Sequence, residues 1–237
     1  MIRVWVFLWL LTGCASTPEP VPEPRPDAPS TLSRASVMDG NLAGLNLSLT
    51  PFSHLGRSVS PVRAELLAAE QRYLPYLLKT TLTESGFWGA VRVTPSIDVT
   101  AELNCQGQLL SASAAELQVQ LICRDALGKL WLDDRFDTRI APDAYLQAGV
   151  DGRDPYRPVM VRIANRLADG LASFTDEDRR RLRDAALLRY AQTLSPEGFD
   201  GYLAVDAEGL MQVQGLPASS DPMVARVQRI RDSEYQF

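Results

Sequence analysis

The stretch between residues 103 and 136 alternates apolar and polar side chains in three successive segments, and this pattern leaves little choice of local fold. A period of two is typical of strands that bury one face. A turn around Ser113 separates the first two segments, and Asp125 and Gly128 fit the first and fourth positions of a type I turn before the third. We therefore predict an antiparallel three-stranded meander. One of its faces is apolar and buried, and we call it the dry face; the other is rich in amide side chains and faces water. The dry face comprises Leu103, Cys105, Gly107, Leu109, Leu117, Val119, Leu121, Cys123, Leu130, Leu132 and Phe136.

The register of this meander is strongly specified, because a slip of one residue would move every apolar side chain to the wrong face. If the second turn pairs residue 123 with residue 130, then 121 meets 132 and 117 meets 136. The apolar faces then agree across all three strands. Asp134 is the exception, because this pairing places it on the dry face opposite Val119.

The sequence before the meander predicts a strand, a helix and a short strand. Leucines alternate with polar residues over 45–49, and an apolar stripe at helical spacing extends over 62–85. Pro75 is expected to split or kink this helix, and Gly86 to end it in a left-handed cap. The short strand is expected at 91–93.

The sequence after the meander is mainly helical in pattern. Apolar residues at every fourth position predict a helix over 154–174, and Thr175 followed by three acidic residues is typical of a helix start. The region 195–220 is expected to be mostly loop, with a weak hairpin across its middle, and Asp221 and Pro222 to open a last helix. The predicted fold class is α/β (α+β): a small mixed sheet with the meander packed by helices, plus a helical C-terminal extension.

Residues 1–13 form a leader rather than a part of the fold. The apolar run over 4–11 is shorter than the roughly 20 residues of a spanning helix and is typical of a secretory signal peptide. The segment 11–14 ends in Cys14 and resembles the bacterial lipoprotein signal, which implies that Cys14 is acylated, with chains such as palmitate, and becomes the new N-terminus. The residue after the acylated cysteine is Ala15 rather than Asp, which in such lipoproteins implies transport to the outer membrane. The alternative is an ordinary signal peptide with an incidental cysteine.

A proline-rich tether follows over 14–41, before an α/β domain over 42–174 and a mainly helical extension over 175–237. Prolines at almost every second position prevent helix and sheet. Polyproline II geometry gives the proline-rich stretch a reach of roughly 40 Å. We interpret it as a spacer, with a docking motif for a proline-binding partner as the alternative.

Composition excludes several functions. The chain has 24 Lys and Arg against 29 Asp and Glu, so it lacks the basic surface that non-specific nucleic-acid binding needs. One His and three Cys leave almost no zinc-site candidates, and we expect no metal or cofactor. His54 is expected in a loop between strand and helix, in a structural or surface role. Asp133 and Asp134 are adjacent in a strand and point to opposite faces, so we interpret them as a charged strand end rather than a catalytic pair.

Cys105 and Cys123 form a pair once Cys14 is consumed by lipidation. Both side chains point to the same face of the predicted hairpin, and both residues are equally far along the chain from its turn. They would therefore lie directly opposite each other, with their Cα atoms close enough for a disulfide. The oxidising periplasm favours a structural disulfide. Two buried free thiols are the alternative.

Two further groups could bind a partner. Trp88 and Trp131 would form an exposed aromatic patch, although packing beneath a helix on the side of the sheet opposite to the dry face is the preferred interpretation for Trp131. Four arginines follow the predicted helix start at Thr175 and form either a solvated face or an anion- or partner-binding patch. They are Arg179, Arg180, Arg181 and Arg183.

The order of elements resembles the small α/β domain shared by CsgG, FlgO and the amino-terminal domain of TolB. The similarity lies in a strand ending in Pro51-Phe52, a helix ending at Gly86, and the meander with Asp125, Gly128 and Leu130-Trp131. It covers about residues 45–174. The resemblance implies a periplasm-facing accessory protein of an envelope assembly, without enzymatic activity. The sequence has no long amphipathic hairpins, so a secretion channel is not implied.

We therefore expect a non-catalytic lipoprotein, anchored in the outer membrane by its acyl chains and facing the periplasm. Its role would be that of an accessory or scaffold component of a secretion, flagellar or surface-polymer system, with an unnamed envelope protein as partner. The alternative is a binding module for a cell-wall glycan or other envelope ligand, for which a cleft lined by the glutamine-rich face and Trp131 would be evidence. A hydrolase using His54 or a carboxylate pair is the least favoured hypothesis.

Overall fold

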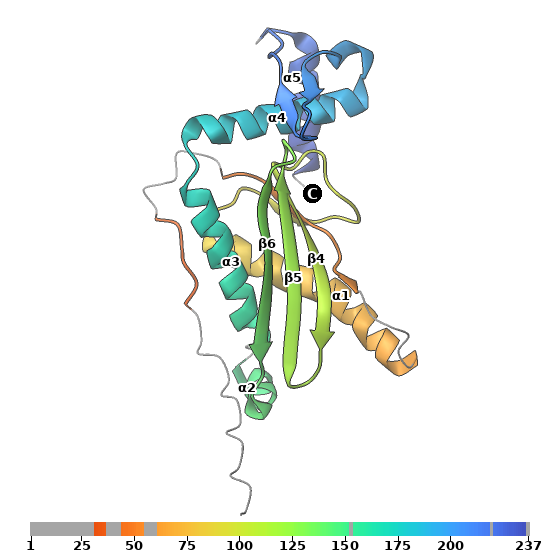
Figure 1. Ribbon diagram of the computed structural model, residues 1–237. Coiled ribbons are helices and arrows are strands. Elements are labelled where there is room, and N and C mark those ends of the chain that lie inside the picture. The colour runs from red at the N-terminus through yellow and green to blue at the C-terminus, as the bar shows by residue number, and fades with distance from the viewer. Residues whose placement is uncertain (1–30, 37–43, 55–60, 152–153, 219, 236–237) are drawn as a thin grey trace, which may run out of the picture.

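The computed structural model describes residues 31–36, 44–54, 61–151, 154–218 and 220–235. The leader, Cys14 and the proline-rich stretch lie outside the described residues. The fold is mixed α/β, as predicted: helices cover one face of a six-stranded sheet and the other face is open (Figure 1). The strands are β1 (Leu47–Leu49), β2 (Ser53–His54), β3 (Val91–Val93), β4 (Leu103–Ala112), β5 (Glu116–Asp125) and β6 (Leu130–Arg139).

The sheet is parallel at one side and antiparallel at the other. Its strand order is β3-β1-β4-β5-β6, and β2 pairs separately with β4. β1 runs parallel to both neighbours, while β4, β5 and β6 form the predicted antiparallel meander. Because β1 is an inner strand with buried residues at all three positions, Ser48 is buried as well, and its hydroxyl hydrogen-bonds Thr94.

The main helices are α1 (Pro61–Ser85), α2 (Pro142–Asp151) and α3 (Arg157–Ala172). The core lies between the dry face of the sheet and the helices α1 and α3. Of the two expected effects of Pro75, a split or a kink, the split does not occur: α1 continues through Pro75. Proline removes one helical donor, and the carbonyl of Gln71 that it leaves unpaired accepts a hydrogen bond from the backbone N–H of Phe52 at 2.9 Å. Gly86 ends the helix with a φ of 74°, as predicted.

The predicted register between β5 and β6 is wrong by two residues. Cys123 pairs with Leu132, Val119 with Phe136 and Leu117 with Thr138. The turn after Asp125 places Gly128 in the left-handed region, with φ 86°, and thereby adds a residue to the loop. A second irregularity between Cys123 and Arg124 adds another.

Together the two added residues shift the pairing of β6 by an even number of positions, so the dry face still faces the core. Two side chains differ from expectation. Leu130 is 44% exposed rather than part of the core. Asp134 lies opposite Leu121, not Val119, and forms an ion pair of 3.1 Å with Arg166 of α3.

Gly107 is required by a close approach within the core. A Cβ atom at this position would overlap the ring of Phe52, whose backbone is held by α1. We expect Gly107→Ala to lower the free energy of unfolding by about 2 kcal/mol, measured by urea titration, because overpacking forces buried groups to shift. Gly215→Ala, which meets open space, serves as the control and should change little. An equal effect of both substitutions would contradict the packing argument.

The C-terminal segment forms a compact unit at one end of the sheet (Figure 1). It comprises α4 (Asp176–Leu194), a 3-10 turn (Glu197–Phe199), the hairpin β7 (Leu203–Val205) and β8 (Met211–Val213), and α5 (Pro222–Glu234). Thr175 and Asp178 form a capping box on α4, and Asp221 caps α5, so both predicted helix starts are confirmed.

A buried ion pair holds the C-terminal unit to the sheet. The side chain of Glu102, 1% exposed, binds the guanidinium of Arg231 and accepts a hydrogen bond from the backbone N–H of Asn46 at 2.6 Å. Thr100 and Tyr235 share a hydrogen bond of 2.8 Å beside it.

Candidate functional site

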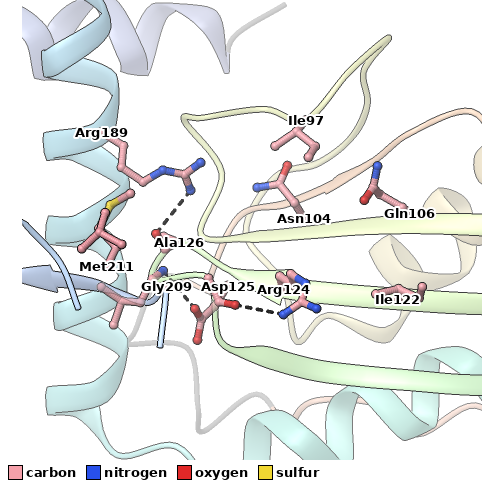
Figure 2. A pocket seen from close by; sticks show the side chains of 13 residues that line it. Ile97, Asn104, Gln106, Ile122, Arg124, Asp125, Ala126, Arg189, Gly209 and Met211 are labelled. Carbon is pink, nitrogen blue, oxygen red and sulfur yellow. Dashed lines mark hydrogen bonds between the residues drawn. The ribbon is translucent and has the colours of Figure 1, made fainter. Parts of the chain in front are cut away.

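A pocket of about 190 Å³ lies where the C-terminal unit meets the open face of the meander (Figure 2). Its residues come from β4, β5, the turn after β5, the loop before β4, α4 and the hairpin β7–β8. Segments distant in the sequence therefore build one site. The fold positions it at the open end of the sheet, on the face that helices α1 and α3 leave uncovered.

The floor of the pocket consists of two paired rows of the sheet. Asn104 lies opposite Arg124, and Gln106 lies opposite Ile122. The amide of Asn104 is engaged in the fold: it donates to the carbonyl of Asp98 at 3.0 Å and accepts from its N–H at 2.9 Å. This contact fixes the loop that brings Ile97 to the rim.

The floor contributes one cation, Arg124, and the wall opposite the floor carries a second one. Arg189 of α4 reaches the turn after β5 and donates to the carbonyl of Ala126 at 3.3 Å (Figure 2). Burial lowers the pKa of Arg189 below the usual arginine value, against the attraction of Asp125 and Asp98. β8 joins the same turn through a hydrogen bond of 2.8 Å from Met211 N–H to the carbonyl of Leu127.

Asp125 lines the pocket and organises the turn after β5. Its carboxylate accepts hydrogen bonds from Leu127 N–H at 2.9 Å, Lys129 N–H at 3.0 Å and the indole of Trp131 at 3.0 Å. Burial raises the pKa of Asp125, and these three donors oppose the rise. The pocket thus combines guanidinium and amide groups and one internally hydrogen-bonded carboxylate with apolar side chains, a combination that suits ligand binding.

The predicted cysteine pair forms the disulfide. Cys105 and Cys123 lie opposite each other on the dry face with Cα atoms 4.1 Å apart, and both are fully buried. The bond ties β4 to β5 beneath the helices, so it is a structural feature of the core.

The two predicted partner-binding tryptophans belong to the packed interior. Trp88 is 7% exposed, and the ring of Trp131 stacks on Phe174 with 4.4 Å between centroids and lies beside Gly170 of α3. Packing of Trp131 is confirmed, but the expected side of the sheet is wrong. The irregularity between Cys123 and Arg124 turns Trp131 to the dry face that α1 and α3 cover. Trp131 does not line the pocket, whereas Gln106 does.

The arginine run does not converge on one site. Arg179 donates to the carbonyl of Leu171 at 3.4 Å, and Arg181 lies 3.6 Å from Glu177 one turn earlier. Arg180 is exposed and Arg183 is half-buried. A partner-binding role for these four residues stays a prediction.

The three residues weighed for catalysis lie away from the pocket. His54 belongs to β2, which pairs with β4 through Leu109, so the expected loop is wrong. Asp133 and Asp134 lie in the middle of β6 rather than at its end. They face opposite sides, as predicted, since Asp133 binds Gln120 at 2.6 Å and Asp134 binds Arg166 of α3.

Arg189, the cation that closes the pocket, was not among the site residues predicted from the sequence. The available signal was an arginine flanked by Leu188 and Tyr190 on a helix, a position where a guanidinium becomes half-buried. Its partner surface, the turn at Ala126, is 63 residues away in the sequence, and helix periodicity says nothing about such a distance.

The arrangement of sheet and helices defines a mixed α/β domain with a helical C-terminal unit, and no family model or curated protein matches the chain. Among solved structures it is similar to the PelC dodecamer from Paraburkholderia phytofirmans, with a TM-score of 0.37 and 10% identity over 60% of this chain and 96% of that chain. It is also similar to hypothetical protein CT253 from Chlamydia trachomatis, with a TM-score of 0.28 and 12% identity over 60% and 97%. A neuraminyllactose-binding hemagglutinin homolog from Helicobacter pylori gives 0.28 and 12% over 59% and 88%.

Among the described residues, no helix combines the length and the hydropathy that crossing a bilayer requires.

Proposed function

We propose that the protein is a non-catalytic outer-membrane lipoprotein that acts as an accessory or scaffold component of a cell-envelope machine. The observation that carries the proposal is the apolar leader ending in Cys14, followed by the proline-rich tether. Two or three acyl chains on one residue hold a protein at a bilayer far more stably than a single chain does. The resemblance to the CsgG, FlgO and TolB domains supports the same class of role.

The cysteine chemistry of the folded part supports an envelope location. Disulfides persist in oxidising compartments such as the bacterial periplasm and are rare in the cytosol. The Cys105–Cys123 bond is buried in the core of the α/β domain. A folded domain that depends on such a bond is suited to the periplasmic side of the outer membrane.

The buried carboxylates support a non-catalytic role. Glu102 is bound by Arg231 and by the backbone of Asn46, and Asp125 is bound by three donors of its own turn and of Trp131. A general acid or base must be within reach of a substrate proton. Both carboxylates are instead engaged in holding segments of the fold together.

In-cell crosslinking of the full chain, followed by membrane fractionation, tests the proposal. We expect the wild-type protein in the outer-membrane fraction, crosslinked to a defined set of envelope proteins. Cys14→Ala should remove the acyl label and release the protein from that fraction, because the thioether to the lipid cannot form. The crosslinked partners should then be reduced severalfold, since a tethered protein samples a higher local concentration.

Cys105→Ala provides the matched control, because it removes a cysteine without touching the leader, and its acylation should equal that of the wild type. A Cys14→Ala protein that keeps its acyl label and membrane fraction would contradict the anchor. Wild-type protein that is acylated but yields no protein adducts would contradict the scaffold role.

A second candidate function is that of a periplasmic binding module for a cell-wall glycan or another envelope ligand. The observation that favours it is the pocket at the open face, whose floor includes Gln106 of the glutamine-rich surface. This function uses the same anchor and tether and differs in what the folded domain recognises.

A further inference from the structure

Two guanidinium groups line the pocket without an ion pair to any carboxylate of the described residues. Arg189 makes one hydrogen bond, to the carbonyl of Ala126, and Arg124 makes one of 3.2 Å to the carbonyl of Gly128. Both are therefore anchored on the same turn. Because a guanidinium carries five N–H donors, most donors of each group remain available to a ligand.

The position of Arg189 favours an anionic partner. Its side chain is half-buried, and a cation withdrawn from water needs a countercharge or suffers a desolvation penalty. Burial lowers the pKa of Arg189, which reports this penalty. Asp125 and Asp98 attract it through space. The Asp125 carboxylate is held in the turn by its three donors, and the Asp98 carboxylate is engaged with Thr100 and Arg92. A ligand carboxylate would supply the missing close contact.

The open face beside the pocket matches the chemistry of sugar hydroxyls. The side chains of Gln106, Gln108 and Gln118 make no hydrogen bond to other described residues. Gln108 lies opposite Gln120, one row beyond the pocket floor. Amides both donate and accept hydrogen bonds, as hydroxyl groups do.

The apolar part of the pocket suits the same ligand. Ile97, Ile122 and Met211 line it alongside the two arginines (Figure 2). Binding sites for small molecules typically combine apolar side chains with a few placed polar groups. The C–H face of a sugar ring would contact these three residues.

We propose that this pocket binds an acidic oligosaccharide, with the carboxylate of a uronic acid unit between Arg124 and Arg189 and the adjoining sugars along the glutamines of the open face. This inference rests on the second candidate function and names its ligand class. It is independent of the lipid anchor.

Isothermal titration calorimetry of the full chain with tetragalacturonate tests the proposal. We expect binding by the wild type and a loss of affinity of about tenfold or more in Arg189→Met, because a hydrogen-bonded charge pair is removed. Arg124→Met should weaken binding as well. Arg180→Met removes an exposed arginine from the same helix outside the pocket, and its affinity should equal that of the wild type.

The fully methyl-esterified tetramer tests the carboxylate without altering the protein, and it should bind the wild type at least about tenfold more weakly. Equal affinity for ester and acid, or unchanged affinity in both pocket variants, would overturn the proposal. If inorganic phosphate binds as tightly as the tetramer, the pocket recognises anions in general. That result would overturn the proposal that its ligand is a saccharide.

A neutral tetramer of N-acetylglucosamine separates this inference from the function on which it rests. Binding of the neutral glycan alone would overturn the acidic ligand and leave the glycan-binding function standing. Absence of binding to every glycan would overturn both.

Discussion

Replacing Cys105 and Cys123 together by alanine is expected to lower the free energy of unfolding by about 3 kcal/mol. The bond closes a loop between residues 18 apart in the sequence, which limits the unfolded chain. Both sulfurs also fill the core between sheet and helices, so their removal leaves small cavities that add to the loss. Urea titration of the oxidised wild type and of the double variant measures the difference.

Reduction provides the control for this prediction. A reducing agent should destabilise the wild type and leave the double variant unchanged, because only the wild type has a bond to lose. A wild-type midpoint that is insensitive to reduction would contradict the stabilising role of the disulfide. A midpoint that falls equally in both proteins would indicate an effect elsewhere in the chain.

Replacing Arg231 by methionine is expected to destabilise the docked C-terminal unit by about 3–5 kcal/mol at neutral pH. The substitution leaves the Glu102 carboxylate buried beneath the unit without its cation. Hydrogen exchange of the α5 amides measures the effect, because undocking exposes that helix. Arg229→Met, which removes an exposed arginine from the same helix, is the matched control and should change exchange little.

The pH dependence of the Arg231→Met effect identifies Glu102 as its source. Burial raises the pKa of Glu102 above its usual value, while Arg231 opposes the rise. A raised native pKa means that the carboxyl favours folding below its unfolded pKa and loses that contribution as the pH rises through the native value. Without Arg231 the native pKa rises further, so the defect should be largest near about pH 7 and smaller near about pH 4.

A double variant completes this test. Glu102→Gln combined with Arg231→Met removes both charges and keeps an oxygen for the backbone N–H of Asn46. It should recover much of the stability lost in Arg231→Met and lose the pH dependence. An Arg231→Met defect that is the same at both pH values would contradict the buried-charge explanation.

The strength of the local predictions follows from the physics of short segments. The alternation at 103–123 placed both cysteines on one face, and a strand has no other way to bury such a pattern. Thr175 and Asp221 begin helices because their side chains accept hydrogen bonds from the first turn, an interaction within a few residues. Gly86 and Gly128 occupy left-handed positions that glycine adopts without steric cost.

The errors arose where a local rule allowed two outcomes. The turn at Asp125 and Gly128 was recognised, but a type I turn followed by a left-handed glycine lengthens the loop and shifts the register. Pro75 was expected to split or kink α1, and the split does not occur. The helix continues because Phe52, 23 positions earlier, supplies the hydrogen bond to the unpaired carbonyl of Gln71.

The sequence by itself determined the α/β class, the dry face of the meander, the cysteine pair and the helix starts, because each depends on periodicity or on contacts a few residues apart. Only the tertiary structure decided that Arg231 meets Glu102, 129 residues away, and that Arg189 closes a pocket over Arg124 and Gln106. Such contacts depend on how the C-terminal unit seats against the end of the sheet. That docking depends on the complementary shapes of the two surfaces and on the desolvation of the groups between them. Neither property produces a periodic pattern in the sequence.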